Sequence, residues 1–113
     1  DELPVWSGND DLTVPLLSLG AKGVISVLSN VRPKRTLQMV RACQAGDYAA
    51  AGRMQVALTP LIDALFSEIN PIPVKQALSL MGIPAGLPRL PLTPLSATHL
   101  PALEQALSAA PEP

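Results

Sequence analysis

The first third of the chain contains two short apolar runs separated by a helical pattern. The first run, Leu3–Ser7, ends at a glycine and predicts a short strand. Asn9-Asp10 then offers N-cap side chains for a helix over about Asp11–Leu19. The second run, Gly23–Leu28, is apolar and rich in β-branched residues, which predicts a strand buried on both faces of a sheet.

After the second run, apolar residues recur at helical spacing. A helix is expected from Pro33 to about Ala45, with Asn30 as a candidate cap before it. In Tyr48–Phe66 the apolar residues form one stripe, and Pro60 inside it is expected to kink the helix. Prolines and apolar spacing predict three later segments: helices at 71–82 and 98–109, and an extended strap over the surface at 83–96.

The order strand, helix, strand, helix indicates an α/β fold with parallel strands. Two parallel strands are joined by a crossover helix, but two strands alone cannot form a sheet that is buried on both faces. We therefore expect the strand at Gly23–Leu28 to need neighbours, and the chain to be the C-terminal part of a longer α/β protein. The alternative is a free-standing helical interaction module with a two-stranded ribbon, whose apolar stripes would close on one another.

Composition narrows the class of partner and the compartment. Of the 113 residues 48% are hydrophobic but only 3% aromatic, so the core must consist mainly of aliphatic side chains. A net charge of −1 argues against nucleic acid or an anionic membrane surface as a partner. No apolar run approaches the roughly 18 residues of a transmembrane helix, and no signal-peptide pattern is seen, so a cytoplasmic protein is expected.

The chain offers little metal or redox chemistry. Cys43 is the only cysteine, which excludes an internal disulfide. His99 is the only histidine and has no carboxylate at metal-ligand spacing, so it is expected at the surface or at a helix start. No metal site and no cofactor is predicted.

Four blocks of sequence resemble one enzyme family. The blocks are SGND at 7–10, GAKGVISVLSNVRPK at 20–34, NPIPVKQALSLMG at 70–82 and RLPLTPLS at 89–96. In this order and spacing they are similar to the C-terminal portion of dihydrodipicolinate synthases, also called 4-hydroxy-tetrahydrodipicolinate synthases. The alternative within the same resemblance is another pyruvate-dependent aldolase of the N-acetylneuraminate lyase superfamily.

The resemblance implies the C-terminal part of a (β/α)8 TIM barrel. Leu3–Ser7 would be strand seven and Gly23–Leu28 strand eight. Residues 1–46 would form the last two βα units of the barrel, and residues 47–113 a C-terminal helical extension packed beside it. The helix that contains Pro15 and Leu19 matches a region that helps to form a homotetramer in the family.

The implied chemistry is the condensation of pyruvate with aspartate 4-semialdehyde in lysine biosynthesis through the diaminopimelate route. A barrel lysine forms a Schiff base with pyruvate, and a tyrosine relays protons. In the family both lie on earlier strands, and none of Lys22, Lys34 and Lys75 matches the nucleophile position. We therefore expect no catalytic residue in this chain, and no activity from it alone.

Two residues of this chain match substrate-binding positions of the family. Gly8 corresponds to the glycine after strand seven, where the absence of a side chain lets the backbone approach the substrate. Ile25 corresponds to the strand-eight residue whose main-chain carbonyl faces pyruvate or its enamine. Asn9 stands where many synthases have aspartate, which keeps a capping side chain but loses a charge.

The basic run RPKR, Arg32–Arg35, opens the helix after the second strand. A phosphate site is one interpretation, because loops after the last two strands of barrels often bind phosphate and cations are unfavourable at a helix N-terminus. No glycine-rich cradle accompanies the run. A solvated cationic face is therefore the expected role.

Overall fold

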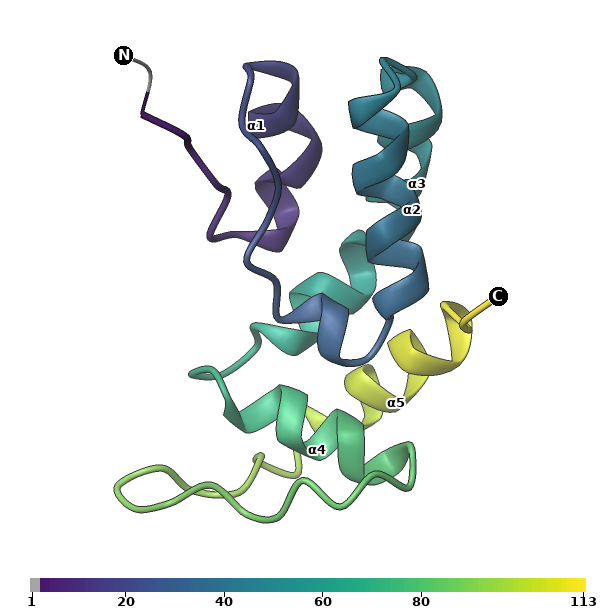
Figure 1. The fold of residues 1–113 in the computed structure, drawn as a ribbon. Coiled ribbons are helices and arrows are strands. Elements are labelled where there is room, and N and C mark those ends of the chain that lie inside the picture. The colour runs from purple at the N-terminus through teal and green to yellow at the C-terminus, as the bar shows by residue number, and fades with distance from the viewer. Residues whose placement is uncertain (1–2) are drawn as a thin grey trace.

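The structure, a computed structural model, describes residues 3–113, and these are mostly helical (Figure 1). The described residues contain five α-helices and two short 3-10 helices. In chain order the elements are η1 (Asp10–Leu12), α1 (Thr13–Ser18), η2 (Leu28–Asn30), α2 (Pro33–Gln44), α3 (Tyr48–Leu65), α4 (Ile72–Leu80) and α5 (Leu100–Ala109). No described helix is both long enough and apolar enough to cross a membrane.

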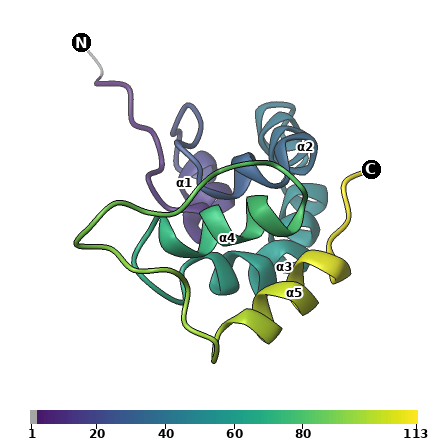
Figure 2. The ribbon, with the colours of Figure 1, turned by 90° about the horizontal axis from the view of Figure 1, so that it is seen from below.

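The helices form two groups that share α3. Helices α1, α2 and α3 pack side by side at one end of the molecule, and α4 and α5 lie across the other end (Figure 1). The far end of α3 contacts both α4 and α5, so this long helix connects the groups. Seen from below, the strap at 83–96 loops around the outside of α4 before it reaches α5 (Figure 2).

Local chemistry explains several helix boundaries. Gly20 ends the α1 turn with a φ of 101°, a conformation that favours glycine. Asp47 caps α3, because its carboxylate accepts a hydrogen bond from the Ala50 amide at 2.9 Å. Proline stands in the first turn of α2, α4 and α5, where its missing N–H costs no helical hydrogen bond. These helices agree with the predicted ones within a few residues, and α3 continues through Pro60.

The larger core lies where η2, α2, α3, α4 and α5 meet. Its fully buried members are aliphatic, as the composition predicted, and include Leu28, Met39, Leu58, Leu65 and Leu103. A smaller cluster of Leu17, Cys43 and Ala51 holds α1 against α2 and α3. The apolar stripes of the helices therefore close on one another, while the extended segments near the N-terminus stay outside this core.

The described residues do not show the doubly buried strand that was predicted at Gly23–Leu28. Within the described residues only one isolated parallel bridge occurs, between Ser7 and Val24, and neither predicted strand is assigned as regular β-structure. Leu28 already belongs to η2. Ile25 is 74% exposed, because nothing in the described residues covers it.

Side chains that bond to the nearby backbone explain why the extended segment ends early. The Ser29 hydroxyl donates to the Ser26 carbonyl at 3.0 Å, and the Asn30 side-chain amide donates to the Val27 carbonyl at 3.0 Å. Such local bonds compete with a strand ladder and favour a turn. Asn30 therefore stabilises η2, and the prediction that it caps α2 is wrong. The Asn9 side chain likewise makes no capping bond to η1.

Candidate functional site

The site begins with two extended segments that run side by side in parallel. The Lys22 amide donates to the Val5 carbonyl at 2.8 Å, Ser7 to Gly23 at 2.9 Å, and Ile25 to Ser7 at 2.8 Å. This alternation is the pattern of a parallel pair of strands. The Trp6 ring lies over Gly23, where an added Cβ would be 2.5 Å from a ring carbon, so glycine is required for this packing.

The structure brings both predicted substrate-binding residues to the carboxyl end of this pair. Gly8 directly follows the bridged Ser7, and Ile25 directly follows the bridged Val24. Among the described residues no backbone N–H donates to the Ile25 carbonyl, which is therefore free to accept a bond from a ligand. A Cβ added to Gly8 would meet no atom within 4 Å, so nothing in the described part of the chain itself demands glycine there.

A buried carboxylate joins the two loops that follow the extended segments. Asp10 is 2% exposed. Its Oδ2 accepts hydrogen bonds from the amides of Val27 and Leu28, each at 2.9 Å, and its Oδ1 accepts a bond from the Ser26 hydroxyl. The carboxylate thus caps η2, an element that begins 18 residues later in the chain.

A side chain of helix α3 binds the backbone of Asp10 and so helps to hold this residue in place. The Gln55 side-chain amide donates to the Asp10 carbonyl at 3.0 Å, and its oxygen accepts from the Val14 amide at 3.2 Å. The Thr13 hydroxyl also donates to the Asp10 carbonyl, at 2.9 Å. Gln55 is 8% exposed, so its polar atoms have found partners inside the protein, as buried polar groups require.

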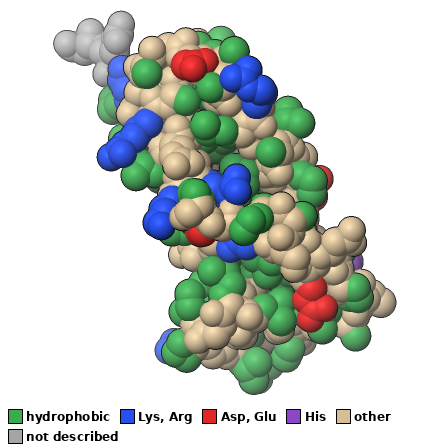
Figure 3. All heavy atoms as spheres, turned by 90° about the vertical axis from the view of Figure 1, so that its right-hand side faces the viewer, with side chains coloured by type: hydrophobic (Ala, Val, Ile, Leu, Met, Phe, Trp, Pro, Cys, Tyr) green, Lys and Arg blue, Asp and Glu red, His purple; other side chains and the backbone are tan. Residues whose placement is uncertain are grey.

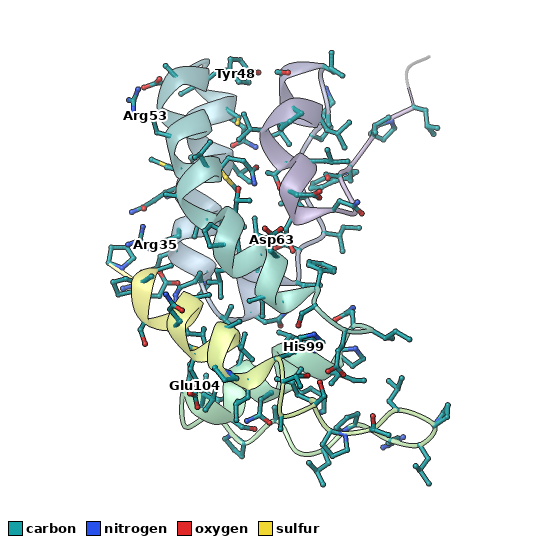
Figure 4. The ribbon with its side chains drawn as sticks, turned by 180° about the vertical axis from the view of Figure 1, so that it is seen from behind. Arg35, Tyr48, Arg53, Asp63, His99 and Glu104 are labelled. Atoms are coloured by element: carbon teal, nitrogen blue, oxygen red, sulfur yellow. The ribbon has the colours of Figure 1, made fainter. Side chains whose placement is uncertain are left out.

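The basic run forms the predicted solvated face only in part, because Lys34 is exposed and Arg35 is half-buried but Arg32 is buried. Arg32 is only 6% exposed, and its guanidinium donates to the carbonyls of Leu107 and Ala110 at the end of α5. Arg35 donates to the Pro111 carbonyl, and the Lys34 ammonium to the Pro113 carbonyl at 3.1 Å. Figure 4 shows Arg35 beside this end of α5. The run therefore binds the C-terminal residues of the same chain.

The charges around the basic run are consistent with the burial of Arg32 and the presence of Glu112 nearby. Burial lowers the pKa of Arg32 below its ordinary value, while the charge of Glu112 opposes that change. Figure 3 shows lysine and arginine side chains gathered on this face with an acidic side chain among them. The Glu112 carboxylate accepts a bond from the Lys34 amide at 2.9 Å. The first turn of α2 thus already has an anion from the chain itself.

A second polar cluster anchors the end of the strap. The Glu68 carboxylate accepts bonds from the Ser96 amide at 3.0 Å and the Ser96 hydroxyl at 2.5 Å, and it pairs with His99 Nδ1 at 2.8 Å. Hydrogen bonds from Ser96, then that from His99, lower the pKa of Glu68 to about 2. His99 is the N-cap residue of α5, the helix-start position that the sequence predicted.

Other sites are scarce in the described residues. Within residues 3–113 no group of three His, Cys, Asp or Glu side chains could hold a metal ion. An open hollow of about 770 Å³ is lined mainly by apolar residues of the first extended segment and of α1 with the turn that follows it, including Leu3, Val5, Leu16 and Leu19. Lys22 is the one titratable side chain among the described residues that line it, so the hollow has the character of a packing surface more than of a catalytic pocket.

Comparison with known proteins fits the arrangement of these segments. The model of the dihydrodipicolinate synthetase family matches residues 1–110. The chain belongs to this family. Members of the family are lyases with TIM-barrel structures, and this chain corresponds to the C-terminal portion of their sequences.

Two curated relatives are 4-hydroxy-tetrahydrodipicolinate synthases. The one from Methanocaldococcus jannaschii is 49% identical over 106 residues, which is 94% of this chain and 37% of the relative. The one from Exiguobacterium is 51% identical over 105 residues, covering 89% of this chain and 36% of the relative. The chain thus spans little more than a third of the length of the family members that it matches.

Solved structures of family members superpose closely on this chain. The dihydrodipicolinate synthase of Thermotoga maritima aligns with a TM-score of 0.89 and 46% identity, covering 93% of this chain and 36% of that one. A lysine-bound synthase from Cyanidioschyzon merolae aligns with a TM-score of 0.90 and 42% identity, covering 94% and 36%. The helices of this chain therefore keep the arrangement that they have in family members.

The sequence did not predict the contacts that three residues of these networks make. Asp10 had been assigned to the cap of its own helix, Arg32 to a solvated face, and Ser26 to no role. All three make contacts across 16 or more residues of sequence. Local spacing carries no signal for such contacts, although a carboxylate directly after a strand and a glycine is a position at which functional groups gather in parallel sheets.

Proposed function

We propose that this chain supplies strands seven and eight and the helical extension of a pyruvate-dependent synthase. The enzyme would condense pyruvate with aspartate 4-semialdehyde on the route to lysine. The observation that carries this proposal is the parallel pair of extended segments in a chain that matches the synthase family. The carboxyl end of this pair presents Gly8 and an Ile25 carbonyl that no described residue binds. Residues 1–46 would complete the barrel, and residues 47–113 would pack beside it.

The two substrate-binding residues have distinct roles in this proposal. Gly8 would let the backbone approach the substrate, and the open space around it supports that role. The Ile25 carbonyl would face pyruvate or its enamine. Its lack of any other donor among the described residues supports this assignment, because an occupied carbonyl would be a poorer acceptor for the ligand.

The nucleophile of the reaction would come from polypeptide outside these 113 residues. Lys34 and Lys75 already donate to the carbonyls of Pro113 and Ala85, and both lie in or beside the helical part of the chain. Lys22 is exposed at the amino end of the second extended segment, away from the Ile25 carbonyl. A buried lysine within reach of pyruvate is what Schiff-base chemistry requires.

Borohydride trapping with pyruvate tests this division of roles. Incubation of the 113-residue chain with pyruvate and borohydride is expected to leave its mass unchanged, while a longer protein that contains these residues gains one reduced pyruvate adduct. Lysine-containing peptides identify the modified residue. An adduct on Lys22, Lys34 or Lys75 would contradict the proposal.

The assay of the longer protein also decides the aldehyde. Condensation with aspartate 4-semialdehyde supports the synthase assignment. Cleavage of N-acetylneuraminate without that condensation would place the protein with the other pyruvate-dependent aldolases of the superfamily. Self-association is a further part of the proposal, since Pro15 of α1 and the 83%-exposed Leu19 directly after this helix are both apolar and exposed.

A further inference from the structure

The buried carboxylate of Asp10 has no part in the chemistry proposed above. It is 2% exposed, and no basic side chain of residues 3–113 forms an ion pair with it. Its charge is stabilised by a hydroxyl and two backbone N–H groups, all from the segment Ser26–Leu28. A buried charge without a counterion is costly unless hydrogen bonds compensate it. Moving Ser26–Leu28 away from the carboxylate would break these bonds, so the segment is held in place.

The segment that Asp10 holds begins at the peptide bond of Ile25. On the preceding side, the Ile25 amide donates to the Ser7 carbonyl at 2.8 Å. On the following side, the Ser26 hydroxyl and the Val27 amide both bind the Asp10 carboxylate. The carbonyl between these anchors therefore has its position and direction fixed from both ends, although it accepts no hydrogen bond from any of residues 3–113.

Asp10 is in turn fixed by the fold. Its own carbonyl accepts bonds from Thr13 and from Gln55 of α3, at 2.9 and 3.0 Å. The carboxylate thus transmits the position of the helical part to the loop that follows the second extended segment. Ser26 extends the network, because its Oγ also accepts the Ser29 amide at 2.8 Å.

We propose that Asp10 is a positioning residue that aims the Ile25 carbonyl at the bound keto acid. This inference rests on the proposed function. Asp10 acts through Ser26, Val27 and Leu28 and does not touch the substrate. Asparagine in its place offers one oxygen and an NH₂ group, so it cannot accept all three bonds. Glutamate keeps the charge but moves the carboxylate by one methylene, which misplaces the same backbone.

The test uses a full-length protein that contains these residues, with Asp10→Asn, Asp10→Glu and Ser26→Ala. For Asp10→Asn the KM for pyruvate is expected to rise about tenfold, since small misplacements of a binding group cost one to two orders of magnitude. The KM for the aldehyde changes far less. Ser26→Ala removes one of the three bonds and is expected to raise the KM for pyruvate by a smaller factor. Asp10→Glu is expected to have a KM for pyruvate above the wild-type value.

Amide hydrogen exchange supplies a readout that does not depend on activity. The amides of Val27 and Leu28 are expected to exchange at least about tenfold faster in Asp10→Asn, because each loses a charged acceptor. Asp47→Asn is the matched control: it makes the same chemical change at the cap of α3, far from Ile25, and keeps a capping oxygen. It is expected to leave the KM for pyruvate and these two amides unchanged.

The outcomes separate the two proposals. A wild-type protein that binds no pyruvate overturns the proposed function and with it the substrate role of Ile25. An active wild type whose Asp10→Asn variant exchanges faster at Val27 but keeps its KM for pyruvate overturns the role of Asp10 alone. If Asp10→Asn does not fold, Ser26→Ala decides the question by the same KM comparison.

Discussion

At the scale of single residues, Arg32 illustrates how one buried cation can end a distant helix. The last turn of α5 leaves carbonyls without helical partners, and the guanidinium donates to those of Leu107 and Ala110. A positive charge is also favourable at a helix C-terminus. The residue that opens α2 in sequence therefore closes α5 in space.

Replacing this arginine should loosen α5. Arg32→Gln is expected to lower the free energy of unfolding by about 2 kcal/mol, because buried carbonyls lose charged donors. Urea unfolding measures the loss, and hydrogen exchange should show faster exchange in residues 103–110. Arg41→Gln on the exposed face of α2 is the control and should change stability by less than about 0.5 kcal/mol. Equal effects of the two variants would contradict the role of Arg32.

Glu68 gives a prediction about acid stability. Its pKa in the folded protein is about 2, below the ordinary 4.5 of a glutamate. A lowered pKa contributes stability that is complete above pH 4.5 and is lost as the pH falls toward 2. Glu68→Gln should therefore be less stable than the wild type near neutral pH, and its stability should fall less steeply over this interval.

Urea unfolding at several pH values between 2 and 6 measures this difference. Glu104→Gln, at an exposed position of α5, is the matched control and should keep the wild-type pH dependence. If Glu68→Gln followed the wild-type curve as closely as this control does, the Ser96 and His99 contacts would have no energetic effect in solution.

At the scale of elements, α3 connects both groups of helices. The cap of α3 should therefore contribute to the stability of the whole molecule. Asp47→Ala removes the acceptor of the Ala50 amide and is expected to lower the free energy of unfolding by about 1 kcal/mol. Asp63→Ala makes the same change in the last turn of the same helix, where a negative charge is unfavourable, and should be neutral or slightly stabilising. Thermal unfolding followed by circular dichroism compares the two variants, and the opposite order would contradict the assignment of the cap.

At the scale of the whole molecule, several exposed apolar residues lie at the paired extended segments, outside the helical core. Trp6 is 54% exposed, Ile25 74% and Leu3 87%, and all three lie on or beside the paired extended segments. Large apolar side chains that are exposed near one another often mark a surface that another polypeptide covers. Within the proposed barrel the neighbouring strands would cover it.

Trp6 is the only tryptophan and therefore reports on this surface. In the isolated chain its fluorescence is expected to show the red-shifted maximum of a hydrated indole, and the emission should move to the blue when polypeptide that completes the barrel is added. Sedimentation velocity would follow the same association by mass. A blue-shifted emission in a monomeric isolated chain would favour the self-contained helical module instead.

The sequence by itself determined the helices and the family. Apolar spacing, Pro33 and the Gly46-Asp47 break set the bounds of α2 and α3 to within a few residues, because helix signals are local. The blocks around Gly8, Ile25 and Asn70 carried the family resemblance, which the match to residues 1–110 confirmed. The assignment of Gly8 and Ile25 to the substrate remains a prediction.

Tertiary structure decided the residues whose partners are distant. The extended segment that was predicted as a strand at Gly23–Leu28 ends at Ile25, because the Asp10 carboxylate and local hydroxyl bonds turn the backbone into η2. The basic run binds the carbonyls at the end of α5, because folding brings residues some 75 positions apart into contact. A residue's type and near neighbours fix its local conformation, whereas the partner of a buried charge is chosen only when the chain has packed and water has been excluded.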